Sequence, residues 1–447
     1  MNPKMKAGTE ELWFFLGYFV LLSAILVLLP VHFAFAQYHY ELTPSISVSE
    51  VYDDNIYLEF TDATSDYITG VTPGLSLNIL SPKMQFELEY APTFVWYAKE
   101  DGNNTVRHAG TLTFGRDLTQ HLRFDLTDTY LFTEEPISET VVGAEGVSVR
   151  VNPRERYPYQ INRGSASLSY LFGAENNLTA GYRNAFLDNK DENLDDFRIP
   201  DDRMLQTPFA TLAYWFNIKN GIELNYELEK ADFRRKDDFE PRDDYTGNWA
   251  EIRYLYRFTP HTTGSVRYDY TTREFDGVTE DYALHEGSMG LEHAFSPDLS
   301  VTLAGGYIVQ KNEYSKDKSA PSYEGSLTKT FARGSFTVGA ESGVDELVLD
   351  EPGQGITRFW RANAAIEYQL LEPLRGYAGL FYRRNEGEEE RKWQTWTGNC
   401  GLVWEFLRWY SLSLDYTYTD RDYEVDELGY TVNQVMLRLT ASRLFRW

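Results

Sequence analysis

Residues 410–419 read YSLSLDYTYT, and this stretch decides the fold. Tyrosine and leucine occupy every second position, and serine, threonine or aspartate fills the positions between them. Because successive side chains of a β-strand point to opposite faces, the stretch predicts a strand with one apolar and one polar face. The same alternation recurs at 122–127, 222–229 and 251–258, and no helical period of 3.6 residues is sustained along the chain.

The connections between these runs alternate in length. Nine short connections fall at 81–83, 117–120, 173–176, 217–220, 259–261, 296–298, 332–334, 371–373 and 407–409. Ten longer, charged segments lie between the runs, the longest at 133–156, 188–203 and 233–245. Alternating short turns and long loops are typical of a membrane barrel threaded as antiparallel pairs.

Nineteen connections join twenty strands, so the sequence predicts an all-β, transmembrane, antiparallel up-and-down β-barrel of about 20 strands. The range is 18–22, because the run 375–384 alternates poorly and the segment 133–156 has room for a hairpin. The first strand is expected within about ten residues of Gln37, which leaves no plug domain before the barrel.

The composition agrees with a barrel. The mean hydropathy is −0.46, as in a soluble protein, yet 15% of the 447 residues are aromatic. A barrel reconciles the two values, since its lipid-facing positions are apolar while its lumen and loops are polar. The formal net charge of −26 argues against nucleic-acid binding, and the single Cys400 excludes an intramolecular disulfide.

The N-terminus carries a targeting pattern. Residues 12–36 are nearly all apolar, Lys4 and Lys6 precede them, and Ala34 and Ala36 place small residues before Gln37. This pattern predicts a cleavable signal peptide over residues 1–36 and a barrel domain over 37–447. The alternative is a single membrane anchor.

The C-terminus alternates as well. Apolar residues recur at every second position back from the end, at Val435, Leu437, Leu439, Ala441, Phe445 and Trp447. The spacing and the final aromatic residue are similar to the terminal strand that outer-membrane proteins present to the barrel-assembly machinery, which is therefore an expected partner. Arg443 interrupts the pattern once.

The polar faces of the runs predict the channel lumen. The charged residues assigned to it are Glu223, Glu227, Glu229, Arg253, Arg257, Arg267, Asp269, Asp415 and Arg438. A barrel of this size is too wide for side chains to fill, so water is expected inside, with the segment 133–156 folded inward as a constriction. Few aromatic residues are expected on the inner face, and its mixed charges suit a charged or hydrated polymer that moves without tight binding.

Catalysis, cofactors and metals are not expected. No Ser/His/Asp set stands at a readable spacing, and His285 and His293 share the apolar face of one run, an interfacial position. The acidic segment 188–203 is interpreted as a solvated loop, with calcium binding or a divalent bridge to lipopolysaccharide as the alternative. Asp53 to Asn55 favour a turn, with cation binding as the alternative.

Two segments near the N-terminus carry a family resemblance. Residues 45–57 read SISVSEVYDDNIY and residues 65–77 read SDYITGVTPGLSL. This pair resembles a family of outer-membrane β-barrel porins that often occur with exopolysaccharide export systems. The resemblance implies a bacterial outer-membrane protein, surrounded by outer-membrane lipid and lipopolysaccharide.

The same resemblance implies a channel for hydrophilic solutes, most specifically the exit for an exopolysaccharide. A separate periplasmic polysaccharide-export protein would then dock at turns such as 117–121 and 259–262. Two alternatives stay open: a general diffusion porin for small solutes, and a structural or adhesive barrel with acidic surface loops.

Overall fold

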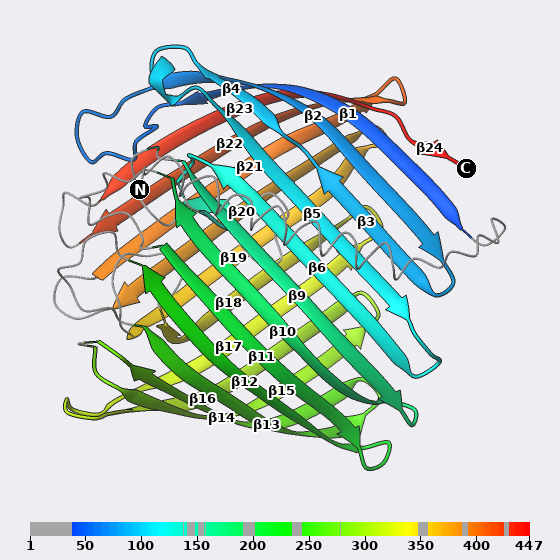
Figure 1. Cartoon of the computed structure of the whole chain (residues 1–447), viewed down its shortest axis with the longest axis vertical. Coiled ribbons are helices and arrows are strands. Elements are labelled where there is room, and N and C mark those ends of the chain that lie inside the picture. Colours follow the sequence, from blue (N-terminus) through cyan, green and yellow to red (C-terminus); the bar gives the residue numbers. More distant parts are fainter. Residues whose placement is uncertain are drawn as a thin grey trace, which may run out of the picture.

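The strands form a closed antiparallel barrel (Figure 1). The computed structural model describes residues 38–136, 138–140, 148–150, 156, 158–190, 202–234, 244–277, 279–346, 356–386, 392–423 and 429–447. The predicted signal peptide, residues 1–36, and most of the segments 133–156, 188–203 and 233–245 lie outside these residues.

The elements follow one another as strands along the chain. They are β1 (His39–Asp53), β2 (Asp66–Ser81), β3 (Met84–Tyr90), β4 (Thr93–Tyr97), the 3-10 turn η2 (Asp101–Asn103), β5 (Thr105–Asp117), β6 (Leu122–Thr133), β7 (Ser138–Thr140), β8 (Ser148–Arg150), β9 (Tyr159–Phe172), β10 (Asn176–Asn189), β11 (Asp202–Trp215), β12 (Asn220–Arg234), β13 (Tyr245–Thr259), β14 (Thr262–Phe275), β15 (Tyr282–Ser296), β16 (Leu299–Asn312), β17 (Lys318–Phe331), β18 (Gly334–Glu346), β19 (Ile356–Leu371), β20 (Leu374–Glu386), β21 (Lys392–Phe406), β22 (Tyr410–Tyr423), β23 (Tyr430–Ser442) and β24 (Phe445–Arg446).

The predicted count of twenty barrel strands is confirmed over the described residues. The sheet contains 22 strands, but β3 and β4 both lie between β2 and β5 and form one broken barrel strand. Pro92 stands at the break, where its missing N–H removes a ladder hydrogen bond. In the same way, β24 continues β23 along β1.

Two uncertain segments are settled by the structure. The poorly alternating run 375–384 lies inside β20, which pairs with β19 and β21 along its length. The segment 133–156 does contain a hairpin, formed by β7 and β8. That hairpin is a separate two-stranded sheet, so it adds no strand to the barrel.

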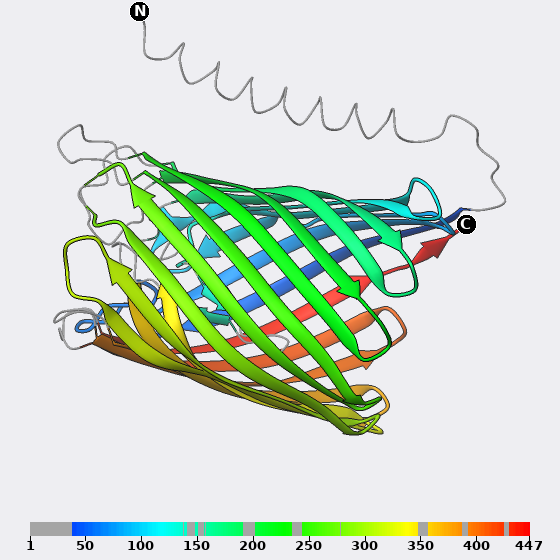
Figure 2. The same cartoon turned by 90° about the horizontal axis from the view of Figure 1, so that it is seen from below.

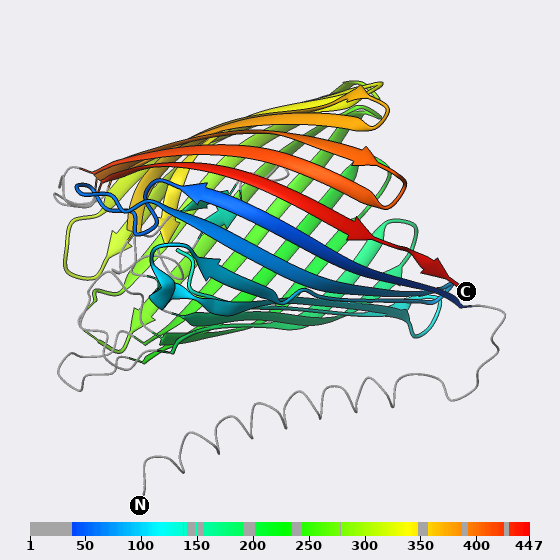
Figure 3. The ribbon, with the colours of Figure 1, turned by 90° about the horizontal axis from the view of Figure 1, so that it is seen from above.

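The first and last strands close the barrel (Figure 3). β1 pairs with β23 from Ser45↔Ser442 to Asp53↔Gln434, and β24 continues this pairing. The Trp447 backbone donates to Tyr40 O at 3.2 Å and accepts from Tyr40 N at 3.1 Å. Closure removes the sheet edge, so backbone groups find partners within the sheet, as a lipid environment requires.

The interruption at Arg443 has a structural cause. β23 ends at Ser442 and β24 begins at Phe445, so Arg443 lies in the break between them. Its guanidinium stacks over the rings of Trp409 and Phe445, at 4.6 and 4.7 Å from the ring centroids. The positive charge of Arg443 is therefore stabilised by two aromatic rings beside the turn between β21 and β22.

The two rims of the barrel differ (Figure 2). All nine predicted short connections join strand pairs at one rim, and the ten longer connections lie at the other. By the rule for outer-membrane barrels, the short-turn rim is periplasmic and the long-connection rim is extracellular.

The outer face is apolar and aromatic. Leu224 on β12 lies between Leu212 on β11 and Ile252 on β13, and 38% of Leu224 and 46% of Ile252 is exposed. Outward tyrosines find neighbouring acceptors, such as Asn248 for the Tyr226 hydroxyl at 2.8 Å. Such a surface suits the lipid core and its interfaces. Among the described residues, no helix is long and apolar enough to cross a membrane.

Candidate channel lumen

The pairing register assigns the faces of each strand. Glu223 and Glu251 pair with Arg253 and Asn225 across β12 and β13, on the face opposite the exposed row of Leu224 and Ile252. All nine residues predicted for the lumen lie on this inner face, three on β12, two on β13, two on β14, and Asp415 and Arg438 on β22 and β23.

The inner face of β10 to β15 forms a charged wall. Arg253 lies 3.4 Å from Glu223 and 3.2 Å from Glu251. Arg267 lies 2.9 Å from Asp269 and 3.1 Å from Glu286. Because each arginine here has a carboxylate beside it, the wall presents compensated charge rather than a basic strip.

Two partners in this wall were not predicted from the sequence. Arg183 on β10 pairs with Glu227, and Arg273 on β14 lies 3.2 Å from Glu229. Glu229 also accepts the Tyr245 hydroxyl at 2.7 Å. Both arginines stand at polar positions of alternating runs, which is the signal that would have identified them.

The remaining predicted residues lie apart from these pairs. Arg257, near the short-turn rim, stacks 3.5 Å over the Trp215 ring and lies 2.7 Å from Glu175. Asp415 accepts the Tyr377 hydroxyl across β21 and also binds Ser413 at 3.0 Å. Arg438 is exposed on the inner face two residues from Met436.

The part of the inner face that adjoins the charged wall, from β1 to β10, is rich in hydroxyl groups. Serine and threonine recur at inward positions from β1 to β10, at Ser45, Ser47, Ser49, Thr72, Ser76, Thr111, Thr113, Thr127, Thr129, Ser165, Ser167, Ser169 and Thr179. These side chains are half-buried or exposed, so they face open space inside the barrel. We call this surface the hydroxyl wall.

The interior is filled toward one rim only. Most inward side chains near the long-connection rim are buried, as Asp53, Arg383 and Trp393 illustrate, although Leu131 and Arg163 are exposed there. Inward side chains of the same strands near the short-turn rim, such as Ser45 and Tyr377, are half-buried. The lumen is therefore wide at the periplasmic side and narrow at the extracellular side.

Aromatic residues line the narrow half, which corrects the prediction that few would face inward. Phe233, Tyr245, Phe275 and Tyr282 form a chain of ring contacts across β12 to β15, with centroids 5.3–6.2 Å apart. On the far wall, Arg421 stacks 4.1 Å over Trp393. These rings stand at strand ends, where the short polar runs of the connections obscure the alternation.

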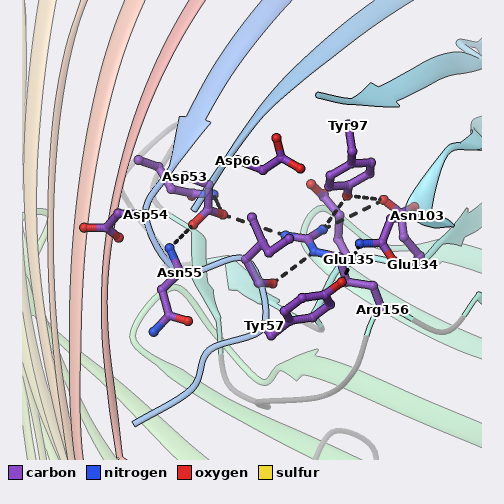
Figure 4. A network of polar contacts seen from close by, with 12 residues as sticks. Asp53, Asp54, Asn55, Tyr57, Asp66, Tyr97, Asn103, Glu134, Glu135 and Arg156 are labelled. Atoms are coloured by element: carbon purple, nitrogen blue, oxygen red, sulfur yellow. Dashed lines mark hydrogen bonds and ion pairs between the residues drawn. The ribbon is translucent and has the colours of Figure 1, made fainter. Parts of the chain in front are cut away.

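A buried ionic network holds part of the narrow half together (Figure 4). The Arg156 guanidinium donates to the Tyr97 hydroxyl at 2.7 Å and to Ile56 O at 3.0 Å. It also lies 3.7 Å from Asp53 and 3.8 Å from Glu134, and all three of these charged side chains are at most 1% exposed. Arg107 on β5 supplies a second guanidinium to Glu134.

Arg156 contacts strands that are distant from β9 in the barrel. Arg156 precedes β9, yet it contacts Asp53 on β1, with β2, β4, β5 and β6 lying between β1 and β9 in the barrel. Asp53 and Tyr97 are inward positions, so Arg156 lies inside the barrel. Arg156 itself therefore lies against the inner wall, while most of the segment 133–156, which was predicted to fold inward, lies outside the described residues.

The Asp53–Asn55 motif forms the predicted turn and also joins the barrel seam. Asp53 accepts from Asn55 N at 2.9 Å, which is a local side-chain turn contact. Asp54 accepts from the Asn433 backbone and side chain, both at 2.7 Å, and Asp53 accepts from Gln434 at 2.7 Å. The motif thus fastens β1 to β23 at the extracellular end.

Other sequence predictions can be placed. His285 and His293 lie on the outer face of β15, where their rings bond the Tyr268 and Thr262 hydroxyls at 2.8 Å. His121 and His261 lie in short turns. Within the described ranges, no three His, Cys, Asp or Glu side chains come together as a metal site.

The fold and the polar interior define the class: the chain is an outer-membrane porin-like β-barrel channel, which confirms the expected location in the bacterial outer membrane. Residues 241–443 match the family model described as "Putative beta-barrel porin 2". The porin resemblance expected from residues 45–77 is therefore confirmed, and by a different part of the chain.

One solved structure supports the fold, and others resemble the chain more distantly. The chain is similar to the FrpB iron transporter from Neisseria meningitidis, with 10% identity and a TM-score of 0.52 over 91% of this chain and 82% of that one. OccAB4 from Acinetobacter baumannii (11% identity, TM-score 0.41, 92% and 100% covered) and OpdK with vanillate from Pseudomonas aeruginosa (10%, 0.40, 91% and 99%) are further matches. No curated protein matches the chain.

Proposed function

We propose that this channel is the outer-membrane exit for an exopolysaccharide. The observation that carries the proposal is the asymmetric lumen, which is wide and hydroxyl-rich toward the periplasm and narrow toward the outside. A polymer leaving the cell would enter the wide half first. The narrow half would then hold it as a single strand and limit the leakage of other solutes.

The proposed mechanism is passive. Serine and threonine hydroxyls both donate and accept hydrogen bonds, so the hydroxyl wall can replace water around sugar hydroxyls one contact at a time. No strong pairing needs to be broken for the chain to advance. The nine charged residues predicted for the lumen are proposed to set the water structure and the ion preference of the bore.

The other expected partners follow from this role. Outer-membrane lipid and lipopolysaccharide would surround the apolar belt, and the barrel-assembly machinery would read the terminal strand. A periplasmic export protein would deliver polymer at the short-turn rim, through turns such as 117–121 and 259–262. We propose a conduit rather than an enzyme.

The test is a deletion strain. Surface polysaccharide is expected to fall and polymer to accumulate in the periplasm, while uptake of small sugars and antibiotics stays unchanged. Quantifying polymer in surface and periplasmic fractions measures the result. Normal surface polymer with lower permeability to small solutes would instead support the diffusion-porin alternative, and a defect only in attachment would support the adhesive one.

Complementation sharpens the test with a matched pair. The variant Ser47→Trp with Ser167→Trp adds bulk to the hydroxyl wall and is expected to restore less export than the wild-type gene. The neighbouring variant Val48→Trp with Leu168→Trp places the same two tryptophans at exposed outward positions and should restore export fully.

A further inference from the structure

We infer that the transported glycan is uncharged, a proposal that rests on the proposed function and narrows its substrate class. The inference rests on two observations. The two rims of the barrel differ in their content of charged residues, and most arginines inside the lumen are paired with carboxylates.

The extracellular connections are acidic without exception. Asp and Glu outnumber Lys and Arg in each of the ten long connections, at 54–65, 98–104, 134–158, 190–201, 235–244, 276–281, 313–317, 347–355, 387–391 and 424–429. Together these ten segments carry most of the formal net charge of −26. Among those that the structure describes, 54–65, 98–104 and 313–317 lie at the long-connection rim. The short turns are nearly balanced, with the bases Lys83, Lys219, Arg333 and Arg408 and the acids Glu175, Asp298 and Glu372.

Most inward arginines of the described residues are already paired with carboxylates, and the exposed Arg163 and Arg438 are the inner-face cations that a polyanion could contact. The lumen therefore offers a polyanion little compensation for this rim. The arginines of the charged wall, Arg183, Arg253, Arg257, Arg267 and Arg273, each lie beside a carboxylate of the same chain. Outside that wall, Arg123, Arg361 and Arg375 are likewise paired, with Asp125, Glu341 and Glu367. A polyanion would have to displace these carboxylates to bind.

Electrostatics then separates the candidate polymers. Surface potentials of several kT at a charged opening change the local concentration of an ion by roughly 10–1000-fold, so an acidic exit disfavours each acidic sugar that approaches it. An uncharged polymer pays no such cost, and the hydroxyl wall supplies the hydrogen bonds that its sugars exchange with water. Uronic-acid or phosphate polymers are therefore the wrong cargo.

The experiment compares two probes in planar bilayers. Uncharged maltodextrin and oligogalacturonate of equal length are added to the short-turn side, and the frequency of current-blocking events is counted. We expect maltodextrin to block at least about tenfold more often at low salt, with the gap narrowing in 1 M KCl because the Debye length falls to roughly 3 Å. A salt gradient should give a reversal potential that favours cations.

A matched variant isolates the rim. Asp62, Asp101 and Asp276 are exposed loop residues, and the triple variant Asp62→Asn, Asp101→Asn, Asp276→Asn should raise the oligogalacturonate event frequency. Glu372→Gln, at the opposite rim, serves as the control and should leave it unchanged. Because all four side chains are exposed, folding should not be affected.

The outcomes separate the two proposals. If oligogalacturonate blocks as often as maltodextrin or more often, the uncharged-glycan inference is overturned while export of some polymer stands. If neither sugar blocks the channel, the export proposal fails. The reversal potential then tests the charge argument alone, and a preference for anions would overturn that argument as well.

Discussion

Replacing Leu224 with arginine should destabilise the barrel by about 2–4 kcal/mol, the cost of a cationic side chain at the bilayer midplane on a barrel's lipid face. Leu224 lies in the outward row with Leu212 and Ile252, where a guanidinium would face lipid. The free energy of unfolding is measured in lipid vesicles by urea titration, with tryptophan fluorescence as the readout.

The adjacent residue provides the control. Asn225 faces inward and donates to Glu251 at 2.8 Å, so Asn225→Arg places the same new side chain among carboxylates and water. That variant should lose much less stability than Leu224→Arg, because its guanidinium lies among carboxylates and water instead of lipid. Equal losses in both variants would mean that the faces are assigned wrongly, because a one-residue register slip exchanges them.

The strands and their faces could be predicted because alternation is a local property. Each alternating run, such as 222–229, indicates which of its own side chains face lipid, and no information about other strands is needed. The turns could be predicted for the same reason. The residue types at Ser296, Pro297 and Asp298 favour a turn whatever the neighbouring strands are. The strand count then followed from counting connections.

The interior could be predicted only in part. Alternation places Arg183 and Glu227 on the inner face, but their pairing depends on two successive strand registers that one sequence does not reveal. The aromatic side chains of the narrow half were missed because Tyr245 and Trp393 stand at strand ends. There, no full period is available to assign a face.

The network around Arg156 could not be inferred from local sequence patterns. Asp53, Tyr97 and Glu134 come from three separate parts of the chain, and Arg156, which precedes β9, contacts all three. The inward fold of the segment 133–156 could be expected from its length and the width of the barrel. The role of Arg156 in holding this segment could not be predicted.

Arg156→Ala should release this fastening and raise the single-channel conductance. Asp53 would lose its guanidinium partner and Glu134 one of its two, and breaking a buried ion pair typically costs about 3–5 kcal/mol. The end of the connection is then no longer held against the inner wall. Conductance in planar bilayers and the thermal unfolding midpoint measure the two effects.

Two further variants test the cause. Arg163 is an inward but exposed arginine of β9, so Arg163→Ala should leave the unfolding midpoint unchanged. Adding Asp53→Asn to Arg156→Ala removes the buried carboxylate that has lost this guanidinium and should recover part of the lost stability. An Arg156→Ala channel with wild-type conductance would show that the segment does not narrow the bore.

The central claim is a water-filled channel that opens widely toward the periplasm, and polymer exclusion in planar bilayers tests it most directly. Polyethylene glycols of increasing size are added to one side at a time while the ion conductance is recorded. The account predicts stepwise conductance, with larger polymers entering from the short-turn side than from the long-connection side. An absence of conductance steps from folded protein, or larger polymers entering from the long-connection side, would contradict it.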